Sequence, residues 1–390
     1  MNAESPRFPL FDSLRAIAAL TVVGFHVAFF TGSLGGGGAS HWYGQLNVGV
    51  TIFFLVSGFL LYRPFAQARF AGTRPPRLVP YAIRRALRIV PAYWLALIGI
   101  GLWLGIDAIF TPHGILTYFG FLEVYDQASI AGADGIGQIW TLCVEASFYL
   151  LLPLWALALR RIRFSGTRGF VLSEAAVLGA AYAAAVVWLL ATTQTDAQGH
   201  VAFSSSLVVL PAYLDHFALG MGLAVASVAL AGRAPALTRR PLIPWALALA
   251  AFGALGLAST VAGAGGELLR HELKGLVALG VLVPAIWVAP RSAVARLLAW
   301  PPLLWVGVVS YGLYLWHPAI LRKMATAGWQ DSLGTVGFGL VGLALSLVVA
   351  AASWYGLERW GLKLGRRLTG RPMTEPDGRP VPASPQPQSG

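Results

Sequence analysis

The chain is a series of long apolar stretches separated by short polar breaks. A helix needs about 20 successive apolar residues to cross the roughly 30 Å hydrocarbon core of a bilayer. Stretches of this kind predict ten membrane-spanning helices, near residues 13–30, 47–65, 89–106, 138–159, 171–191, 205–230, 241–262, 273–290, 303–321 and 333–356. The pattern therefore predicts an all-α, polytopic integral membrane protein.

Two longer polar segments interrupt or follow these stretches. Residues 107–137 are too polar to cross a bilayer, and we expect them outside it, with a short interfacial helix at 114–124. The end of the chain is rich in Pro and Ser and has almost no large apolar residues. We therefore expect a transmembrane domain over 8–365 and a disordered cytoplasmic tail over 366–390.

The composition narrows the class of protein further. Residues of the AVILMFWYC set make up 57% of the chain, and charged residues only 11%. Soluble domains carry about 25% charged residues, so the composition excludes a soluble enzyme, a disordered chain and a nucleic-acid module. The N-terminus lacks the pattern of a cleavable signal, so we expect the first apolar stretch to remain as a spanning helix.

The net charge of +12 is distributed unevenly across the predicted loops. With a cytoplasmic N-terminus, 24 of the 28 Lys and Arg residues lie on the cytoplasmic side; the exceptions are Arg270, Lys274, Arg322 and Lys323. This bias predicts that both termini are cytoplasmic, and it supports an even number of spans. The one cysteine, Cys143, excludes intrachain disulfides and an all-cysteine metal site, and we expect no bound metal.

Five ionisable residues stand out inside the predicted spans. Inserting such a side chain costs about 2.5–3.5 kcal/mol at the centre of a helix, so each one is a candidate for function. The alternative for each is a hydrogen bond that only joins two helices. The five residues are His26, Glu145, Asp215, His216 and His317.

The first span places a cation and an imidazole on one face. Arg15 and His26 are eleven residues apart, which is about three helical turns and about 16 Å. Glu145 reaches a similar depth in the fourth span if the two helices are neighbours. A carboxylate beside an imidazole fixes its tautomer, so the pair is suited to general-base chemistry.

A basic segment precedes the third span. Arg85 and Arg88 are three residues apart at the start of a helix, so they share a face and can together bind a phosphate or diphosphate. The alternative is that they are positive-inside anchors that face anionic lipid. Spacing alone leaves both interpretations open.

These residues lie within motifs that resemble those of the acyltransferase-3 family of integral membrane acyltransferases. The similarity runs from about residue 8 to about residue 365. Its motifs, in family order, are FDSLRAIAALTVVGFH from Phe11, GVTIFFLVSGFLL from Gly49, RRALRIVPAYW from Arg84, IWTLCVEASFYLLLP from Ile139, LDHFALGM from Leu214, VGVVSYGLYLWHP from Val306 and LERW from Leu357.

The resemblance implies an activity and a site. Members of the family transfer an acyl group, usually acetyl, from cytoplasmic CoA thioesters to hydroxyls of carbohydrates or related acceptors. By resemblance, His26 is the catalytic residue, Arg15 and Glu145 are essential nearby, and Arg85 and Arg88 contact CoA. Acyl-CoA is then a co-substrate, and no permanently bound cofactor is expected.

The expected mechanism joins these residues into one reaction. Acyl-CoA docks from the cytoplasm, and His26, paired with Glu145, deprotonates an acceptor hydroxyl that attacks the thioester. Transfer through an acyl-enzyme intermediate remains open. Candidate residues for binding the substrate or steadying the oxyanion are Ser57, Tyr149, Asp215, His216 and His317.

Two other classes of function remain open. Buried His, Glu and Asp residues also serve carriers, so the chain could transport a lipid-linked or small polar substrate. A sensor or scaffold could also keep the fold without the chemistry. For the enzyme, the expected location is a bacterial cell membrane, and the acceptor is an envelope polysaccharide, a glycolipid or a glycosylated natural product.

Overall fold

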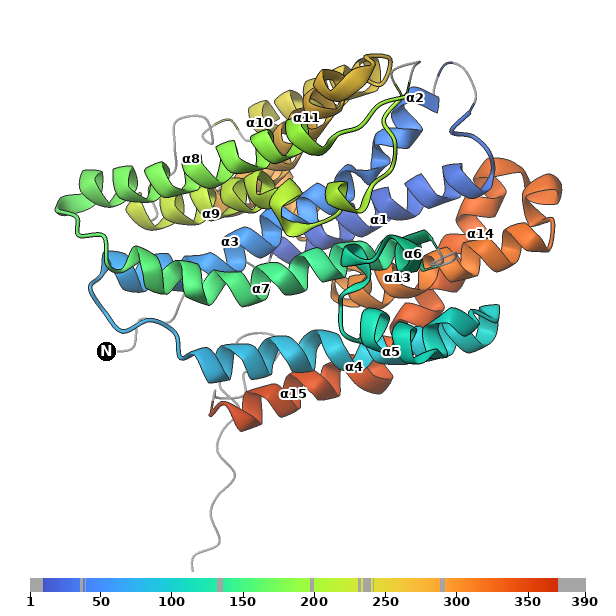
Figure 1. Ribbon diagram of the computed structural model, residues 1–390, viewed down its shortest axis with the longest axis horizontal. Coiled ribbons are helices and arrows are strands. Elements are labelled where there is room, and N and C mark those ends of the chain that lie inside the picture. Colours follow the sequence, from blue (N-terminus) through green and yellow to red (C-terminus); the bar gives the residue numbers. More distant parts are fainter. Residues whose placement is uncertain are drawn as a thin grey trace, which may run out of the picture.

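Long helices arranged side by side make up the computed structural model of the chain (Figure 1). It describes residues 10–35, 38, 40–131, 136–196, 200–230, 233, 240, 242–287 and 292–370. Within these ranges the only β-pairing is one isolated antiparallel bridge between Thr195 and Val201. The predicted all-α class is therefore confirmed.

The helices follow the apolar stretches closely. Eight helical segments are long and apolar enough to cross a membrane, while α10 and α11 occupy the places of the other two expected spans. The number ten and the sides of the termini remain predictions. The helices are α1 (Phe11–Phe30), α2 (Ser40–Tyr43), α3 (Val48–Phe70), α4 (Leu78–Leu104), α5 (Pro112–Phe119), α6 (Gln127–Ala131), α7 (Trp140–Leu159), α8 (Gly166–Thr192), α9 (Leu214–Ala229), α10 (Leu242–Ala258), α11 (Gly263–Trp287), α12 (Ala293–Leu298), α13 (Pro301–Thr326), α14 (Trp329–Ser353) and α15 (Arg359–Leu368).

Helix α4 starts well before the span that the apolar pattern predicts near residue 89. Its first turns contain Arg84, Arg85 and Arg88, and it ends before Gly105, whose φ of 68° is a left-handed conformation suited to glycine. The arginines interrupt the apolar pattern, so these turns were not included in the predicted span. Because the turns are helical, Arg85 and Arg88 do lie on neighbouring turns of one helix.

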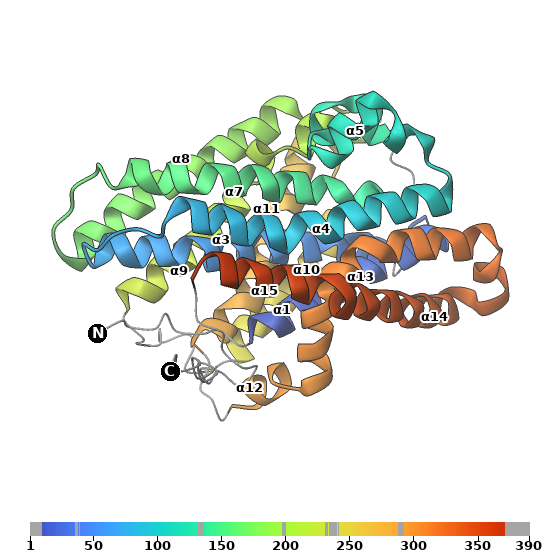
Figure 2. The ribbon, with the colours of Figure 1, turned by 90° about the horizontal axis from the view of Figure 1, so that it is seen from below.

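The end of the described chain lies beside α4. A π-helical turn at Trp354–Glu358 follows α14 and leads into α15, which runs alongside α4 (Figures 1 and 2). Gly361 lies directly against the carbonyl of Leu87, where a larger residue has no room. α15 continues to Leu368, and residues 371–390 of the expected tail lie outside the described residues.

Close contacts between small residues hold the central helices together. Gly58 of α3 lies against the backbone of Phe217 in α9, and Gly220 of α9 lies against the backbone of Leu55 in α3. Small residues let two backbones approach closely, which increases van der Waals contact between helices in a membrane. Gly307 of α13 packs against the carbonyl of Asp12 in α1 in the same way.

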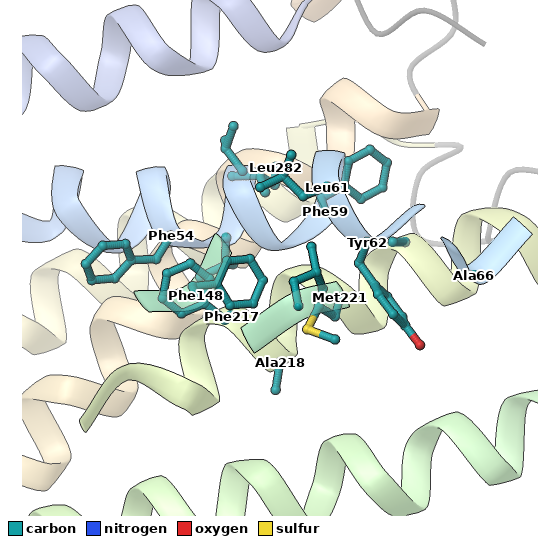
Figure 3. Packing of buried hydrophobic residues seen from close by; sticks show 14 of the residues in the cluster. Phe54, Phe59, Leu61, Tyr62, Ala66, Phe148, Phe217, Ala218, Met221 and Leu282 are labelled. Atoms are coloured by element: carbon teal, nitrogen blue, oxygen red, sulfur yellow. The ribbon is translucent and has the colours of Figure 1, made fainter. Parts of the chain in front are cut away.

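An aromatic cluster fills the space among α3, α7 and α9. The ring of Phe217 stacks on Phe148 at 4.0 Å between centroids and on Phe54 at 4.9 Å, as Figure 3 shows. All three side chains are buried. Since Phe54 also lines the cavity described below, this cluster supports one wall of the candidate site.

A buried ion pair joins α3 to α8. The guanidinium of Arg69 lies 2.6 Å from Oε1 of Glu174, and Tyr62 donates to Oε2 of the same carboxylate at 2.5 Å. Arg69 also donates to the carbonyls of Leu159 and Ile162. From the sequence Arg69 is one of many positive-inside anchors, but its buried position gives it a structural role.

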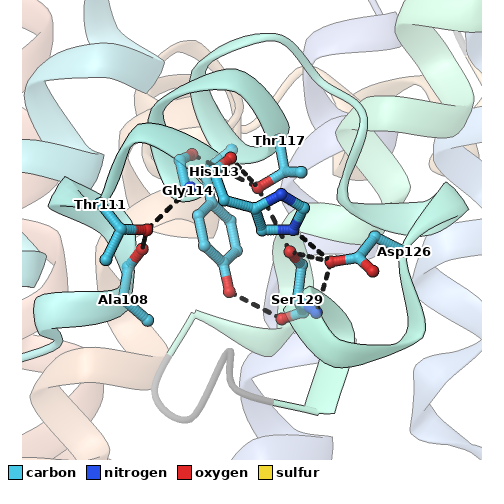
Figure 4. Close-up of polar contacts among 8 residues, drawn as sticks. Ala108, Thr111, His113, Gly114, Thr117, Asp126 and Ser129 are labelled. Atoms are coloured by element: carbon cyan, nitrogen blue, oxygen red, sulfur yellow. Dashed lines mark hydrogen bonds and ion pairs between the residues drawn. The ribbon is translucent and has the colours of Figure 1, made fainter.

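The described part of the polar segment between α4 and α7 is folded, and it contains α5 where a short helix was expected. Thr111 caps α5 by accepting from the backbone N–H of Gly114 at 2.9 Å (Figure 4). Asp126 accepts from the Ser129 hydroxyl at 2.5 Å and from His113 at 2.8 Å. These hydrogen bonds lower the pKa of Asp126 to about 2.

Candidate active site

One cavity gathers many of the residues singled out from the sequence. Its wall is formed by five helices: α1, α3, α4, α7 and α13. It combines three arginines, one carboxylate and several aromatic rings. The lining residues are Arg15, Val50, Phe53, Phe54, Val56, Ser57, Arg85, Arg88, Ile89, Thr141, Leu142, Glu145, Tyr149, Ser310, Tyr311 and Tyr314.

The three arginines make one region of this wall cationic. Arg15 forms an ion pair with Asp12, one turn earlier on α1, at 2.6 Å. Among the described residues, neither Arg85 nor Arg88 forms an ion pair with an acidic side chain. A guanidinium group without an acidic partner is suited to an anionic ligand, above all a phosphate, because it presents several hydrogen-bond donors in a planar array.

Glu145 has hydrogen-bond partners other than the expected histidine. Ser57 of α3 donates to Oε1 at 2.8 Å, and Tyr149, one turn further along α7, donates to Oε2 at 2.5 Å. Because both hydroxyls donate to the carboxylate, neither is available as the oxyanion donor considered from the sequence. The Arg85 guanidinium lies over the Tyr149 ring, 5.5 Å from its centroid.

His26 pairs with His317 instead. The two rings meet edge to face, and His317 Nε2 lies 3.1 Å from His26 Nδ1. The close packing of α1 on α13, seen at Gly307 and Asp12, brings the two histidines together. Among the described residues, no hydrogen bond joins His26 to Glu145. His317 is fully buried and His26 is partly exposed.

The acceptors around this pair decide which nitrogens carry protons. His317 Nδ1 lies 2.8 Å from the carbonyl oxygen of Leu313, which can only accept, so this nitrogen donates and Nε2 of a neutral ring has the lone pair. His26 Nδ1 lies 3.0 Å from the carbonyl oxygen of Val22 and therefore donates as well. A neutral His26 thus carries its lone pair on Nε2, the basic nitrogen needed for proton abstraction.

Tyr314 lies near both the cavity and the histidine pair, although His26 and His317 are not among the residues described as lining the cavity. It lines the cavity, its ring centroid lies 6.0 Å from that of His317, and Phe53 meets it edge to face at 5.7 Å. The Tyr314 hydroxyl pairs with that of Thr141 at 2.7 Å, which fixes the ring. Tyr314 is one turn before His317, so helical spacing from a candidate histidine could have found it.

Asp215 and His216, expected in the middle of a span, lie in the first turn of α9. They form a separate cluster with His271 of α11 and are not among the described residues that line the cavity. The sequence interpretation missed His271 because the predicted span began at residue 273, after a run of charged residues. α11 in fact begins at Gly263, so His271 is inside the helix.

Comparison with known proteins agrees with this architecture. The model of the Acyl_transf_3 family, described as an acyltransferase domain, matches residues 9–355. The chain belongs to this acyltransferase family. Together with the apolar helices, this membership makes the chain a multi-pass bacterial membrane protein.

Several named proteins are similar over most of this chain. The peptidoglycan O-acetyltransferase OatA of Listeria monocytogenes is 25% identical over 372 residues, which are 90% of this chain and 55% of OatA. The exopolysaccharide production protein ExoZ of Rhizobium meliloti is 26% identical over 325 residues, 82% of this chain and 90% of ExoZ. The chain therefore spans about half the length of OatA. No solved structure matches it significantly.

Proposed function

We propose that this acyltransferase moves an acyl group, acetyl in the first instance, from acyl-CoA to a hydroxyl of a carbohydrate acceptor. The observation that carries the proposal is the joining of Arg15, Arg85 and Arg88 in one cavity. The ring of Tyr314, in the wall of this cavity, lies 6.0 Å from that of His317, the partner of His26. Relatives named as O-acetyltransferases of peptidoglycan support the acyl group and the class of acceptor.

The arginines bind the donor in this proposal. CoA carries phosphates that need cationic partners, and Arg85 and Arg88 lack an acidic partner among the described residues. They lie on the early turns of α4, in the basic segment that the predicted distribution of positive charge assigns to the cytoplasmic side. The pantetheine arm then extends along α1, past Arg15, towards His26, a distance of about 16 Å along the helix.

His26 acts as the general base. Its Nε2 takes the proton from the acceptor hydroxyl while the hydroxyl oxygen attacks the thioester carbonyl. The carbon–sulfur bond breaks, and the departing CoA thiolate takes a proton, which returns His26 to its neutral form. His317 is a positioning residue: its Nε2 and the carbonyl oxygen of Val22 share the proton on His26 Nδ1, which keeps the lone pair of His26 on Nε2.

In this proposal Glu145 has a role other than the pairing with His26 that was inferred from its depth in the fourth predicted span. Its carboxylate accepts from the Tyr149 hydroxyl, and the Tyr149 ring lies under Arg85. We assign Glu145 to positioning the donor-binding arginine through Tyr149. The residues proposed to bind phosphate and the proposed general base then belong to two separate groups.

A donor truncated before its phosphates tests this assignment. We expect purified full-length protein in liposomes to consume acetyl-CoA when given a carbohydrate acceptor. Arg88→Gln should raise KM for acetyl-CoA about tenfold, since a charge-assisted hydrogen bond contributes about 1.5–3 kcal/mol. With acetyl-pantetheine, which has no phosphates, Arg88→Gln should match the wild type.

The matched control is Arg74→Gln, because Arg74 is an exposed arginine of the preceding loop and does not line the cavity. It should leave KM unchanged for both donors. Equal losses with both donors in Arg88→Gln would contradict phosphate binding at Arg88. Consumption of no acyl-CoA by the wild type, with any carbohydrate acceptor offered, would contradict the proposed activity itself.

A further inference from the structure

A second polar cluster lies where α9 meets α11. Asp215 and His216 come from the first turn of α9, and His271 comes from α11. All three side chains are buried, with exposed fractions of 0%, 1% and 6%. The cavity described above does not include them among its described lining residues, so the cluster needs an account of its own.

The hydrogen bonds in the cluster leave one nitrogen lone pair without a partner. His216 Nε2 lies 3.2 Å from the backbone carbonyl oxygen of His271, which can only accept, so Nε2 carries the proton. A neutral His216 then has its lone pair on Nδ1. That atom is fully buried and has no hydrogen-bond partner in the described structure, which is costly unless another group binds there.

Asp215 and His271 supply further atoms nearby that can bind a metal ion. His271 Nε2 lies 2.6 Å from Oδ2 of Asp215, while Oδ1 of Asp215 accepts from the backbone N–H of His216 at 2.7 Å. The His216 and His271 rings stack at 4.0 Å between centroids. One ligand atom from each of the three residues lies within 4.8 Å of the other two.

We propose that Asp215, His216 and His271 bind a first-row divalent transition metal ion, with zinc the ion to test. Zinc takes imidazole nitrogen and carboxylate oxygen at about 2.0–2.2 Å, so two atoms bound to one ion are at most about 4.4 Å apart. Closing the set around an ion requires the two stacked rings to rotate out of parallel, because a metal lies in the plane of each imidazole that binds it, and the ion then replaces the proton between His271 Nε2 and Asp215 Oδ2. The bond from His216 Nε2–H to a backbone carbonyl is the support that metal-binding imidazoles usually have.

The surrounding charges are compatible with a dication. Glu272 and Glu267 are close enough to act electrostatically on the cluster, and the cations near it are Arg270, paired with Glu267, and Lys274. The cluster and its surroundings therefore contain three carboxylates, including that of Asp215, and two cations. An ion there would tie the start of α9 to α11, and α9 packs closely on α3, which forms part of the cavity wall.

This site differs from the expectation of no metal, and it does not depend on the proposed acyltransferase activity. The sequence interpretation excluded only an all-cysteine site and did not connect His271 with Asp215 and His216. The three residues come from two segments 55 positions apart or more, and only the packing of α9 on α11 brings them together.

Metal content and thermal stability of the full-length protein in detergent test the proposal. After loading with zinc and removal of free metal, the wild type should retain about one zinc ion per chain. Zinc should also raise its melting midpoint, and a chelator should reverse the rise, since a ligand that binds only the folded state stabilises it. Asp215→Asn, His216→Gln and His271→Gln should each weaken zinc binding by at least about tenfold.

His113→Ala is the matched control. His113 also contacts an aspartate, Asp126, but it lies in the exposed segment around α5 and has no third ligand there. It should bind zinc as the wild type does. A wild type that retains no zinc after loading overturns the proposal whatever the variants do, and so does undiminished zinc binding in a folded His271→Gln protein.

Discussion

His317 Nε2 lies 3.1 Å from His26 Nδ1, which joins two helices whose histidines are 291 residues apart in sequence. Carbonyl oxygens at Val22 and Leu313 fix the tautomers on both sides of this contact. The pair therefore presents the lone pair of His26 on Nε2. This arrangement assigns to His317 the orienting role that the sequence interpretation gave to Glu145.

Removing the ring of His317 should lower kcat rather than donor binding. We expect His317→Leu to reduce kcat about 100-fold, since positioned general-base catalysis contributes about 10²–10⁴-fold. His317→Gln should recover part of this loss because its side-chain oxygen can accept from His26 Nδ1. Steady-state kinetics with varied acetyl-CoA separates kcat from KM.

The control for His317 is His41→Ala, whose ring contacts Ser259 and does not reach the pair. It should retain wild-type kcat. A His317→Leu protein with normal kcat, or a His317→Gln protein no better than His317→Leu, would contradict the orienting role.

The parts of the fold that depend on local pattern could be predicted from the sequence. The apolar stretches predicted the long helices because a helix that is exposed to lipid must consist almost entirely of apolar residues. Charged helical turns were predicted poorly: α4 begins at Leu78 and α11 at Gly263, since Arg, Glu and Lys in their first turns look like loop residues in a hydropathy pattern. Backbone hydrogen bonding continues through such turns all the same.

Contacts between distant segments could not be predicted in this way. The sequence indicated that His26, Glu145 and His317 matter, but which of them meet depends on how α1, α3, α7 and α13 pack. Arg15, Arg85 and Arg88 share one cavity, and the binding of CoA there stays a prediction. His271 and Tyr314 had no signal of their own beyond their place in a helix.

Glu145→Gln should act on donor binding. The amide cannot accept from both Ser57 and Tyr149 with the strength of a carboxylate, so Tyr149 and the Arg85 above it lose their fixed position. We expect KM for acetyl-CoA to rise about tenfold with kcat changed less than about twofold. The opposite split, a large fall in kcat at unchanged KM, would mean that Glu145 assists His26 directly.

The buried ion pair between Arg69 and Glu174 should matter for stability. Arg69→Ala leaves the Glu174 carboxylate buried without its charge partner, which typically costs about 3–5 kcal/mol. The thermal melting midpoint in detergent should fall clearly. Arg74→Ala, at an exposed arginine of the same basic segment, should leave it unchanged.

The double variant Arg69→Met with Glu174→Leu gives a second check on the same pair. Replacing a buried ion pair by apolar side chains is often neutral, so the double variant should melt above Arg69→Ala. A double variant that is less stable than Arg69→Ala would show that the two residues do not act as a pair.

Glu123 should make the stability of the protein depend on pH. Burial raises the pKa of this carboxyl to about 7, so the folded state holds its proton more tightly than the unfolded chain does. The stabilisation is complete below pH about 4.5 and is lost as pH rises through about 7, with a total change of about 3 kcal/mol. The melting midpoint should therefore fall between pH 5 and pH 8 by more in the wild type than in Glu123→Gln.

Asp107→Asn is the control, because Asp107 is an exposed carboxylate in the same outer segment. It should keep the wild-type dependence on pH. If Glu123→Gln loses as much stability as the wild type over this range, another group is responsible.

The most direct test of the account is acyl transfer by purified full-length protein in liposomes, followed by CoA release and by ester formation on a carbohydrate acceptor. We predict that the wild type and His41→Ala release CoA and form ester, and that His26→Ala, shown to be folded, does neither at a measurable rate. Ester formation by His26→Ala at the wild-type rate would contradict the central claim. Movement of the acceptor across the membrane without CoA release would support a carrier instead.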